Sequence, residues 1–181
     1  AAQVRFLQDF LQNAPNERLV RAQVPGALAH LLTREKQLPD EGLALRESVV
    51  RGLCARIGEH TSEREELRQS CILALGQLAD LDADPADARA RADLQRIVER
   101  GQTQARAFAL IALGQIGGHP GDGNESANSL DGIRGLLVGK LTGGSTSLRP
   151  WAALGLGISE RELQDLGSAA LPPNADVKTA L

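Results

Sequence analysis

The chain contains very few aromatic residues: three Phe, one Trp and no Tyr in 181 residues. Its core must therefore be built from Leu, Ala, Ile and Val, which suits closely stacked helices better than a β-sandwich or a barrel. Methionine is also absent, and the sequence starts at Ala1. We therefore expect an excised or trimmed segment from which any targeting sequence has been removed. The localisation stays unknown on this basis, with the cytoplasm slightly favoured.

Neither excess charge nor a long apolar run is present. The formal net charge is −3, so the chain lacks the basic footprint by which proteins attract nucleic acid. A membrane-spanning helix needs about 20 consecutive apolar residues, and no such run occurs. We therefore expect neither a nucleic acid nor a membrane as partner.

Cysteine is also rare, and only Cys54 and Cys71 occur in the chain. Two cysteines are too few for a disulfide framework, and neither belongs to a Cys-x-x-Cys motif, which argues against metal or redox chemistry. Each lies on the apolar face of its own predicted helix. A disulfide is geometrically possible if these helices pack antiparallel, but buried free thiols that act as small apolar groups are the simpler interpretation.

The most apolar stretch runs from Gln102 to Gly118, and its residues 107–113 are all apolar. A helix that is apolar on every face must be covered by neighbours on most sides. The chain supplies near copies of this stretch to do so. The copies share an arginine that precedes a glycine by eight residues: Arg68 and Gly76, Arg106 and Gly114, and Arg149 and Gly157. A repeat of about 40 residues with two helices per unit indicates an α-solenoid.

This motif, with its Ala-Leu-Gly run before an aliphatic residue, resembles HEAT repeats. The closest subtype is the short HEAT-like repeat of phycobilin lyases, and the resemblance covers residues 62 to 158. It implies that the second helix of each repeat lines a concave binding face. It also implies a structural part for the three arginines, as a ladder to aspartates or carbonyls that joins one repeat to the next. The alternative is a basic ladder that binds a ligand.

The expected fold is therefore all-α, a solenoid of about four antiparallel helix pairs within residues 1–166. Residues 1–34 form a degenerate first repeat, residues 41–58 a weaker helix, residues 62–158 the clear repeats, and residues 167–181 a loose tail. First helices are expected near 41–58, 85–100 and 129–141, and second helices near 64–79, 103–117 and 147–158. A short final helix is expected from Ser159 to Leu166.

Several helix boundaries are predicted from local signals. Capping boxes at Ser62–Glu65 and Ser159–Glu162 would each open a helix, and Asp84 followed by Pro85 would open another. Three further expectations concern single residues: Thr103 and Thr146 cap the copies of the motif helix, and Pro25 kinks or splits its helix.

The residues that could carry chemistry do not form a recognisable site. The three histidines are isolated, so the His-Glu pairs of the HEAT-like enzyme deoxyhypusine hydroxylase are missing. The loops that start at Asp80 and Asp122 offer oxygen ligands but lack the glycine and glutamate that an EF-hand requires. We predict no catalytic, cofactor-binding or metal-binding residues, and no cofactor. Phycobilin lyase activity does not follow from the resemblance, since one fold hosts many functions.

The remaining function is binding, and we predict a non-enzymatic scaffold for protein–protein interaction. The alternative is a HEAT-like enzyme or cofactor-binding protein, and a third possibility is a spacer within a longer repeat protein. In the resembling family the position five residues after the motif arginine faces the concave side, followed one turn later by a second exposed position. The predicted protein-binding residues are Leu73, Gln77, Ile111, Gln115, Leu154 and Ile158.

Overall fold

The structure is a computed structural model that describes residues 1–13, 18–33, 40–58, 61–121 and 126–167. Within these ranges the chain forms eight α-helices and no strand. The helices are α1 (Ala2–Asn13), α2 (Arg18–Thr33), α3 (Asp40–Ile57), α4 (Glu65–Leu78), α5 (Pro85–Arg100), α6 (Thr103–Gly117), α7 (Ser126–Gly143) and α8 (Arg149–Asp165). The predicted tail lies outside the described residues from residue 168 onward.

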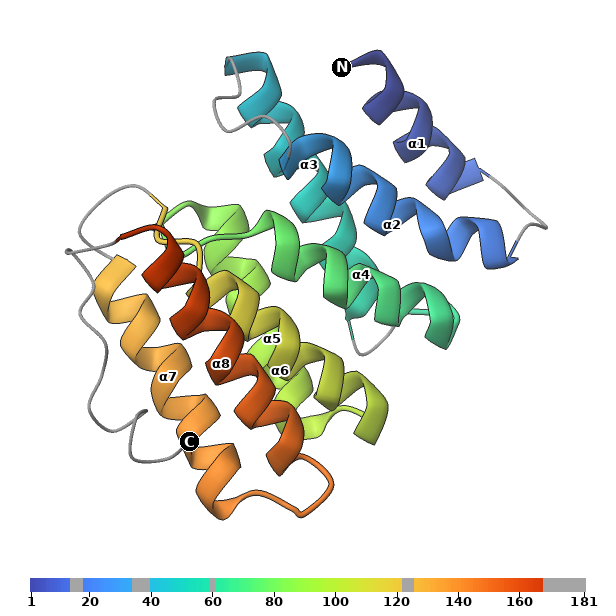
Figure 1. Ribbon diagram of the computed structural model, residues 1–181. Coiled ribbons are helices and arrows are strands. Elements are labelled where there is room, and N and C mark those ends of the chain that lie inside the picture. The colour runs from blue at the N-terminus through green and yellow to red at the C-terminus, as the bar shows by residue number, and fades with distance from the viewer. Residues whose placement is uncertain (14–17, 34–39, 59–60, 122–125, 168–181) are drawn as a thin grey trace.

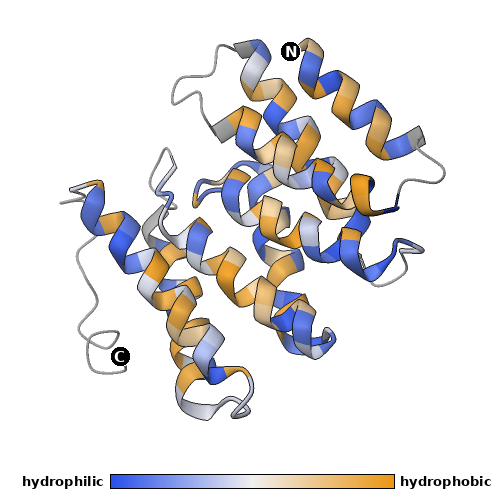
Figure 2. Ribbon diagram, turned by 45° about the vertical axis from the view of Figure 1, so that its right-hand side comes forward, coloured by the Kyte–Doolittle hydropathy of each residue, from blue (hydrophilic) through white to orange (hydrophobic). Residues whose placement is uncertain are grey.

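The helices pack in sequence order as four antiparallel pairs, α1–α2, α3–α4, α5–α6 and α7–α8 (Figure 1). The second helices of the pairs form one continuous layer, because α2 packs against α4, α4 against α6, and α6 against α8. The predicted all-α solenoid is confirmed. Apolar residues occur in every helix of both layers (Figure 2), and together they form one continuous core.

The two layers are packed to different degrees. Among the described residues, α3 packs closely against α5, whereas the backbones of α1 and α3, and of α5 and α7, do not approach closely. Side chains still join α1 to α3, through the Arg5–Glu41 ion pair and the Gln8–Ser48 hydrogen bond. The layer of even-numbered helices is packed along its whole length. We call the even-numbered helices the inner layer and the odd-numbered helices the outer layer, because a stack whose helices pack more closely on one side is expected to curve toward that side.

Glycine permits the close packing of the inner layer. A Cβ atom added to Gly76 in α4 would lie 2.6 Å from the Cα atom of Ala112 in α6. A Cβ atom added to Gly114 would lie 2.6 Å from the Cα atom of Gly155 in α8. Glycine costs about 1 kcal/mol of helix propensity relative to alanine, and the close approach of successive repeats offsets that cost.

The first repeat fits the same register once α2 is included. Arg21 precedes Ala29 by eight residues, and Ala29 is fully buried like the motif glycines of α4 and α6. We expected Pro25 to kink or split its helix; α2 continues through Pro25 from Arg18 to Thr33, so the proline does not split it. Pro25 is buried, and the surrounding packing holds the helix across the lost backbone hydrogen bond.

Only some of the predicted caps are present. Asp84 accepts a hydrogen bond from the backbone N–H of Ala86 at 2.9 Å and caps α5 as expected. The capping box at Ser62 is wrong: Arg64 is the N-cap and makes no side-chain cap bond. Thr61 Oγ1 instead accepts the N–H of Glu63 at 3.2 Å, which holds residues 61–64 outside the helix.

The two predicted threonine caps lie one and two residues from the observed N-caps, and the predicted cap Ser159 lies inside a helix. Thr103 is the first helical residue of α6, behind Gln102, and Thr146 lies in the turn before Leu148. Ser159 does not open a separate helix, because α8 runs without a break from Arg149 to Asp165. Ser159 is fully buried, with its Oγ atom against Gly117 of α6. A serine inside a repeat contact and a serine at a helix start look the same in sequence.

Candidate functional site

The six residues predicted to bind a partner all lie in the inner layer. They come from α4, α6 and α8, in the same register of each repeat. Leu73 and Ile111 are half-buried, whereas Leu154 is 47% exposed. This gradient follows from position, because α4 and α6 are each followed by another inner helix and no described helix follows α8.

Gln115 lies differently from the prediction that it faces a partner. Its Oε1 atom lies over Gly76, and within the described residues this buried atom has no hydrogen-bond partner. Gln115 therefore fills the contact between α4 and α6. Gln77, its counterpart in α4, is exposed.

Two residues that the sequence analysis missed extend the predicted surface. Phe108 is half-buried, and Trp151, the single tryptophan, is 36% exposed. Each lies two residues after the motif arginine, which is one turn before the predicted positions on the same side of the helix. We define the apolar strip as the five apolar residues on this side of α6 and α8: Phe108, Ile111, Trp151, Leu154 and Ile158.

The apolar strip occupies only the C-terminal half of the inner layer. The corresponding positions of α2 and α4 are mostly polar or small, with Gln23, Gly26, His30, Ser70 and Gln77. Leu73 is the one large apolar residue among them. The inner layer therefore changes from polar to apolar along the stack.

The motif arginines are structural in the part of the chain that is described. Arg106 Nε donates to the backbone carbonyl of Val98 at 2.8 Å, and Arg149 Nε donates to that of Gly144 at 3.0 Å. Arg68 pairs with Glu65 at 3.5 Å on its own helix. The predicted carbonyl contacts exist for two of the three, but they join the two helices within a repeat, whereas contacts between repeats were expected.

A different arginine links successive repeats. Arg46 of α3 donates through Nε to the carbonyl of Leu78 at 2.9 Å. Its Nη2 atom lies 2.8 Å from Asp80 Oδ2 and 3.0 Å from Asp87 Oδ2. The guanidinium thus joins the second helix pair to the start of the third.

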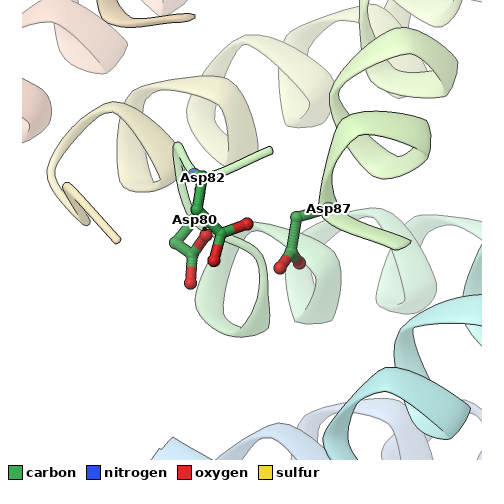
Figure 3. Close-up of side chains that lie close together, drawn as sticks. All are labelled: Asp80, Asp82 and Asp87. Atoms are coloured by element: carbon green, nitrogen blue, oxygen red, sulfur yellow. Dashed lines mark hydrogen bonds between the residues drawn. The ribbon is translucent and has the colours of Figure 1, made fainter. Parts of the chain in front are cut away.

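The carboxylates around Arg46 form the densest acidic cluster in the described residues. Asp80 and Asp82 come from the loop after α4, and Asp87 from the first turn of α5 (Figure 3). One oxygen of each lies within 4.8 Å of the others. The loop is held by Asp82 N–H bound to Asp80 Oδ1 and by Arg91 Nη2 bound to the carbonyl of Asp82 at 2.7 Å. Leu81 N–H also donates to the carbonyl of His119 at 3.0 Å.

Asp87 is the buried member of this cluster. Its side chain is 0% exposed, and Oδ1 has no hydrogen-bond partner among the described residues. Burial raises the pKa of Asp87 to about 7, because Arg46 offsets only part of the cost of an ionised carboxylate that has Asp80 and Asp82 beside it. Burial also raises the pKa of Asp80.

The cluster is best explained as an ion-pair link between repeats. The Arg46 guanidinium already lies against the carboxylates of Asp80 and Asp87, so a metal ion bound by these carboxylates would have to displace it. Asp84, the third oxygen ligand of the EF-hand comparison, is used as the cap of α5. Residues 122–125 of the second such loop lie outside the described residues.

The raised pKa of Asp87 predicts that the protein loses stability as the pH rises. An acid whose folded-state pKa lies above its unfolded value binds protons more tightly in the native state. Its stabilising contribution is complete below about pH 4 and is lost as the pH rises through about 7. Urea denaturation at pH 5 and pH 8 should show a lower free energy of unfolding at pH 8, by about 2 kcal/mol. The variant Asp87→Asn should remove most of this difference, and an unchanged difference would contradict the assignment.

The cysteines and histidines form no reactive group among the described residues. Cys54 and Cys71 are free and buried, as the simpler interpretation predicted, and burial raises the pKa of each thiol to about 12. His30 is exposed, and His119 lies 3.9 Å from Glu162. His60 lies outside the described residues.

No protein-family model matches the sequence, and no curated protein matches it. None of the helices in the described part of the chain combines the length and apolar character needed to cross a membrane.

Proposed function

We propose that the chain is a non-enzymatic scaffold that binds another protein on the inner layer of its helical stack. The observation that carries the proposal is the apolar strip on α6 and α8. Contiguous exposed apolar surface on a folded protein marks a site that something else covers. Solenoids commonly bind their partners on the inner face.

The polarity of the inner layer supports this location. The positions equivalent to the apolar strip in α2 and α4 are mostly polar or small, so apolar residues are not a general requirement of the repeat. Trp151 lies within the strip, and tryptophan is among the residues that contribute most to binding when a partner buries them. A partner segment that presents apolar side chains fits this surface.

We further propose that the repeats belong to the HEAT class. The arginine-to-glycine motif and the tight packing of the second helices support this assignment. Under it, the inner layer is the ligand face and the arginines are structural. The assignment adds no enzymatic activity, because fold and activity are separable.

Two charges placed in the apolar strip are expected to abolish binding. Ile111→Glu combined with Leu154→Glu should lower the affinity for the partner at least 100-fold. Each side chain that the partner buries at the centre of an interface contributes about 2 kcal/mol or more to binding. The partner is identified by using the chain as bait in a lysate of its source and by mass spectrometry of the retained proteins. The affinity of the purified partner for each variant is then measured by calorimetry, with circular dichroism to confirm that helicity is retained.

Leu43→Glu is the matched control, because Leu43 of α3 is 47% exposed, as Leu154 is, but lies in the outer layer. It should leave the affinity unchanged. Equal affinity of the double variant and the unmodified chain would contradict the location of the site. A metal ion or small molecule bound to the purified chain, together with no retained protein, would favour the enzyme or cofactor-binding alternative.

A further inference from the structure

The contact between successive inner helices uses two positions of the repeat. One position is eight residues after the motif arginine, and it faces the next repeat. The other is six residues after the arginine, and it faces the preceding repeat. Gly76 meets Ala112 in this way, and Gly114 meets Gly155. Every such position that has a neighbouring repeat is buried: Ala29, Ala74, Gly76, Ala112, Gly114 and Gly155.

At the C-terminal end of the described stack, the position that faces the next repeat has no neighbouring helix. Gly157 is the eighth residue after Arg149 and is exposed, and a Cβ atom added to it would meet no atom of the described residues within 4 Å. Pro150, two turns before Gly157, and Arg161, one turn after it, lie on the same side of α8 and are also exposed. We call this surface the α8 end face.

At the N-terminal end the complementary position is open. Ala27 is the sixth residue after Arg21 and is exposed, whereas Ala74, Ala112 and Gly155 at the same position are buried. Val20, two turns earlier on the same side of α2, is 49% exposed. An open hollow between α1 and α2, lined by Phe6, Leu7 and Leu31 among others, adjoins this side. We call this surface the α2 end face.

We propose that two copies of this chain associate head to tail, with the α8 end face of one copy on the α2 end face of the other. The two faces are the separate halves of a contact that each chain already makes three times, between α2 and α4, α4 and α6, and α6 and α8. A second copy in the same register would place Ala27 over Gly157, as Ala112 lies over Gly76. The α8 end face would then continue an established helix contact.

Such a contact leaves one end face free on each outer copy. Head-to-tail contacts of this kind form open chains unless the rotation between copies closes a ring. Association should therefore proceed beyond the dimer as the protein concentration rises. This behaviour distinguishes the proposed contact from a symmetric dimer, which stops at two copies.

The test blocks each end face separately and then combines the blocked proteins. Sedimentation velocity is measured for the full chain, for Ala27→Lys and for Gly157→Lys, over about 1 to 500 µM, a range that brackets weak dissociation constants. Both substitutions lie in open, exposed helix positions, and thermal melting confirms the fold. Ala92→Lys, on an exposed position of α5 in the outer layer, is the matched control.

The full chain and Ala92→Lys should associate with rising concentration. Each end-face variant alone should stay monomeric, because its copies have only one kind of free face. The equimolar mixture should form a dimer and no larger species, since one variant supplies the α8 end face and the other the α2 end face. At least a tenfold loss of association is expected for each variant alone.

Three results would overturn the proposal. They are a full chain that stays monomeric, a mixture that stays monomeric, and end-face variants that associate as the full chain does. Association of Ala27→Lys but not of Gly157→Lys would also overturn it, because α8 would then pair with itself. Association that is seen only after residues 168–181 are removed would also overturn it, since those residues would then cover the α8 end face in the full chain. None of these measurements involves the partner of the proposed function, so each proposal can fail alone.

Discussion

Replacing Arg46 with methionine should lower the free energy of unfolding by about 3–5 kcal/mol at pH 8, as the loss of one member of a buried ion pair does. Asp87 is fully buried and would lose its only cationic partner among the described residues, and the carbonyl of Leu78 would lose a donor. Methionine keeps the apolar stem of the side chain, so the loss reports on the charge and its hydrogen bonds. Urea denaturation followed by circular dichroism measures the effect.

Arg51→Met is the control on the same helix. Arg51 pairs with Glu47 one turn away, and its side chain is 60% exposed, so the expected loss is below about 0.5 kcal/mol. The loss caused by Arg46→Met should shrink at pH 5, because Asp87 takes up a proton there. Equal losses for the two arginines would show that the acidic cluster does not link the repeats.

The second large effect is a change in the free energy of unfolding on replacing glycine with alanine. The same replacement at two equivalent positions of the repeat should change it in opposite directions. Gly114→Ala should lower the free energy of unfolding by about 1–3 kcal/mol, because the new methyl group meets the backbone of Gly155 and forces α6 and α8 apart. Gly157→Ala should raise it by about 0.5–1 kcal/mol, because alanine favours the helix and no atom of the described residues lies within 4 Å of the new methyl group. Thermal and urea unfolding at low protein concentration measure both.

These two glycines occupy the same position of the repeat motif, so the sequence alone predicts equal effects. The difference arises only from the stack, in which α8 covers Gly114 and no described helix covers Gly157. Destabilisation of the same size at both positions would contradict the packing of the inner layer.

The sequence was sufficient for the architecture because the repeat signal is long and redundant. The motif recurs in three helices, and each of them lies in the inner layer of the stack. The helix pairs followed from this spacing. The first repeat was harder to recognise, since Ala29 replaces the glycine and Pro25 interrupts the pattern, and only the packing of α2 against α4 places Arg21 in register.

Local signals predicted the helix ends less well. A serine or threonine followed three residues later by glutamate is a capping box only when the chain turns there. Ser62 lies two residues before Arg64, the N-cap of α4, and Ser159 lies inside a contact between repeats. Tertiary packing decides between these environments, and a four-residue motif does not determine that packing.

The sequence placed the predicted binding residues in the fold only in part. The register of the repeat placed Leu73, Ile111 and Leu154 on the inner layer, but the side chain of Gln115 turns into the contact with α4. Phe108 and Trp151 could have been found with the same alignment, by extending it one turn toward the N-terminus. The link through Arg46 could not have been found in this way, because Arg46 and Asp87 are 41 residues apart and belong to no shared motif.

The most direct test of the proposed binding site uses the single tryptophan as a reporter. The chain is labelled with 5-fluorotryptophan, so that ¹⁹F NMR observes Trp151 alone in the presence of the purified partner. A shift of this resonance that saturates with the partner is predicted, together with no shift for a reporter placed in the outer layer by Trp151→Phe and Leu43→Trp. A partner that binds without moving the Trp151 resonance would contradict the claim that the apolar strip is the binding site.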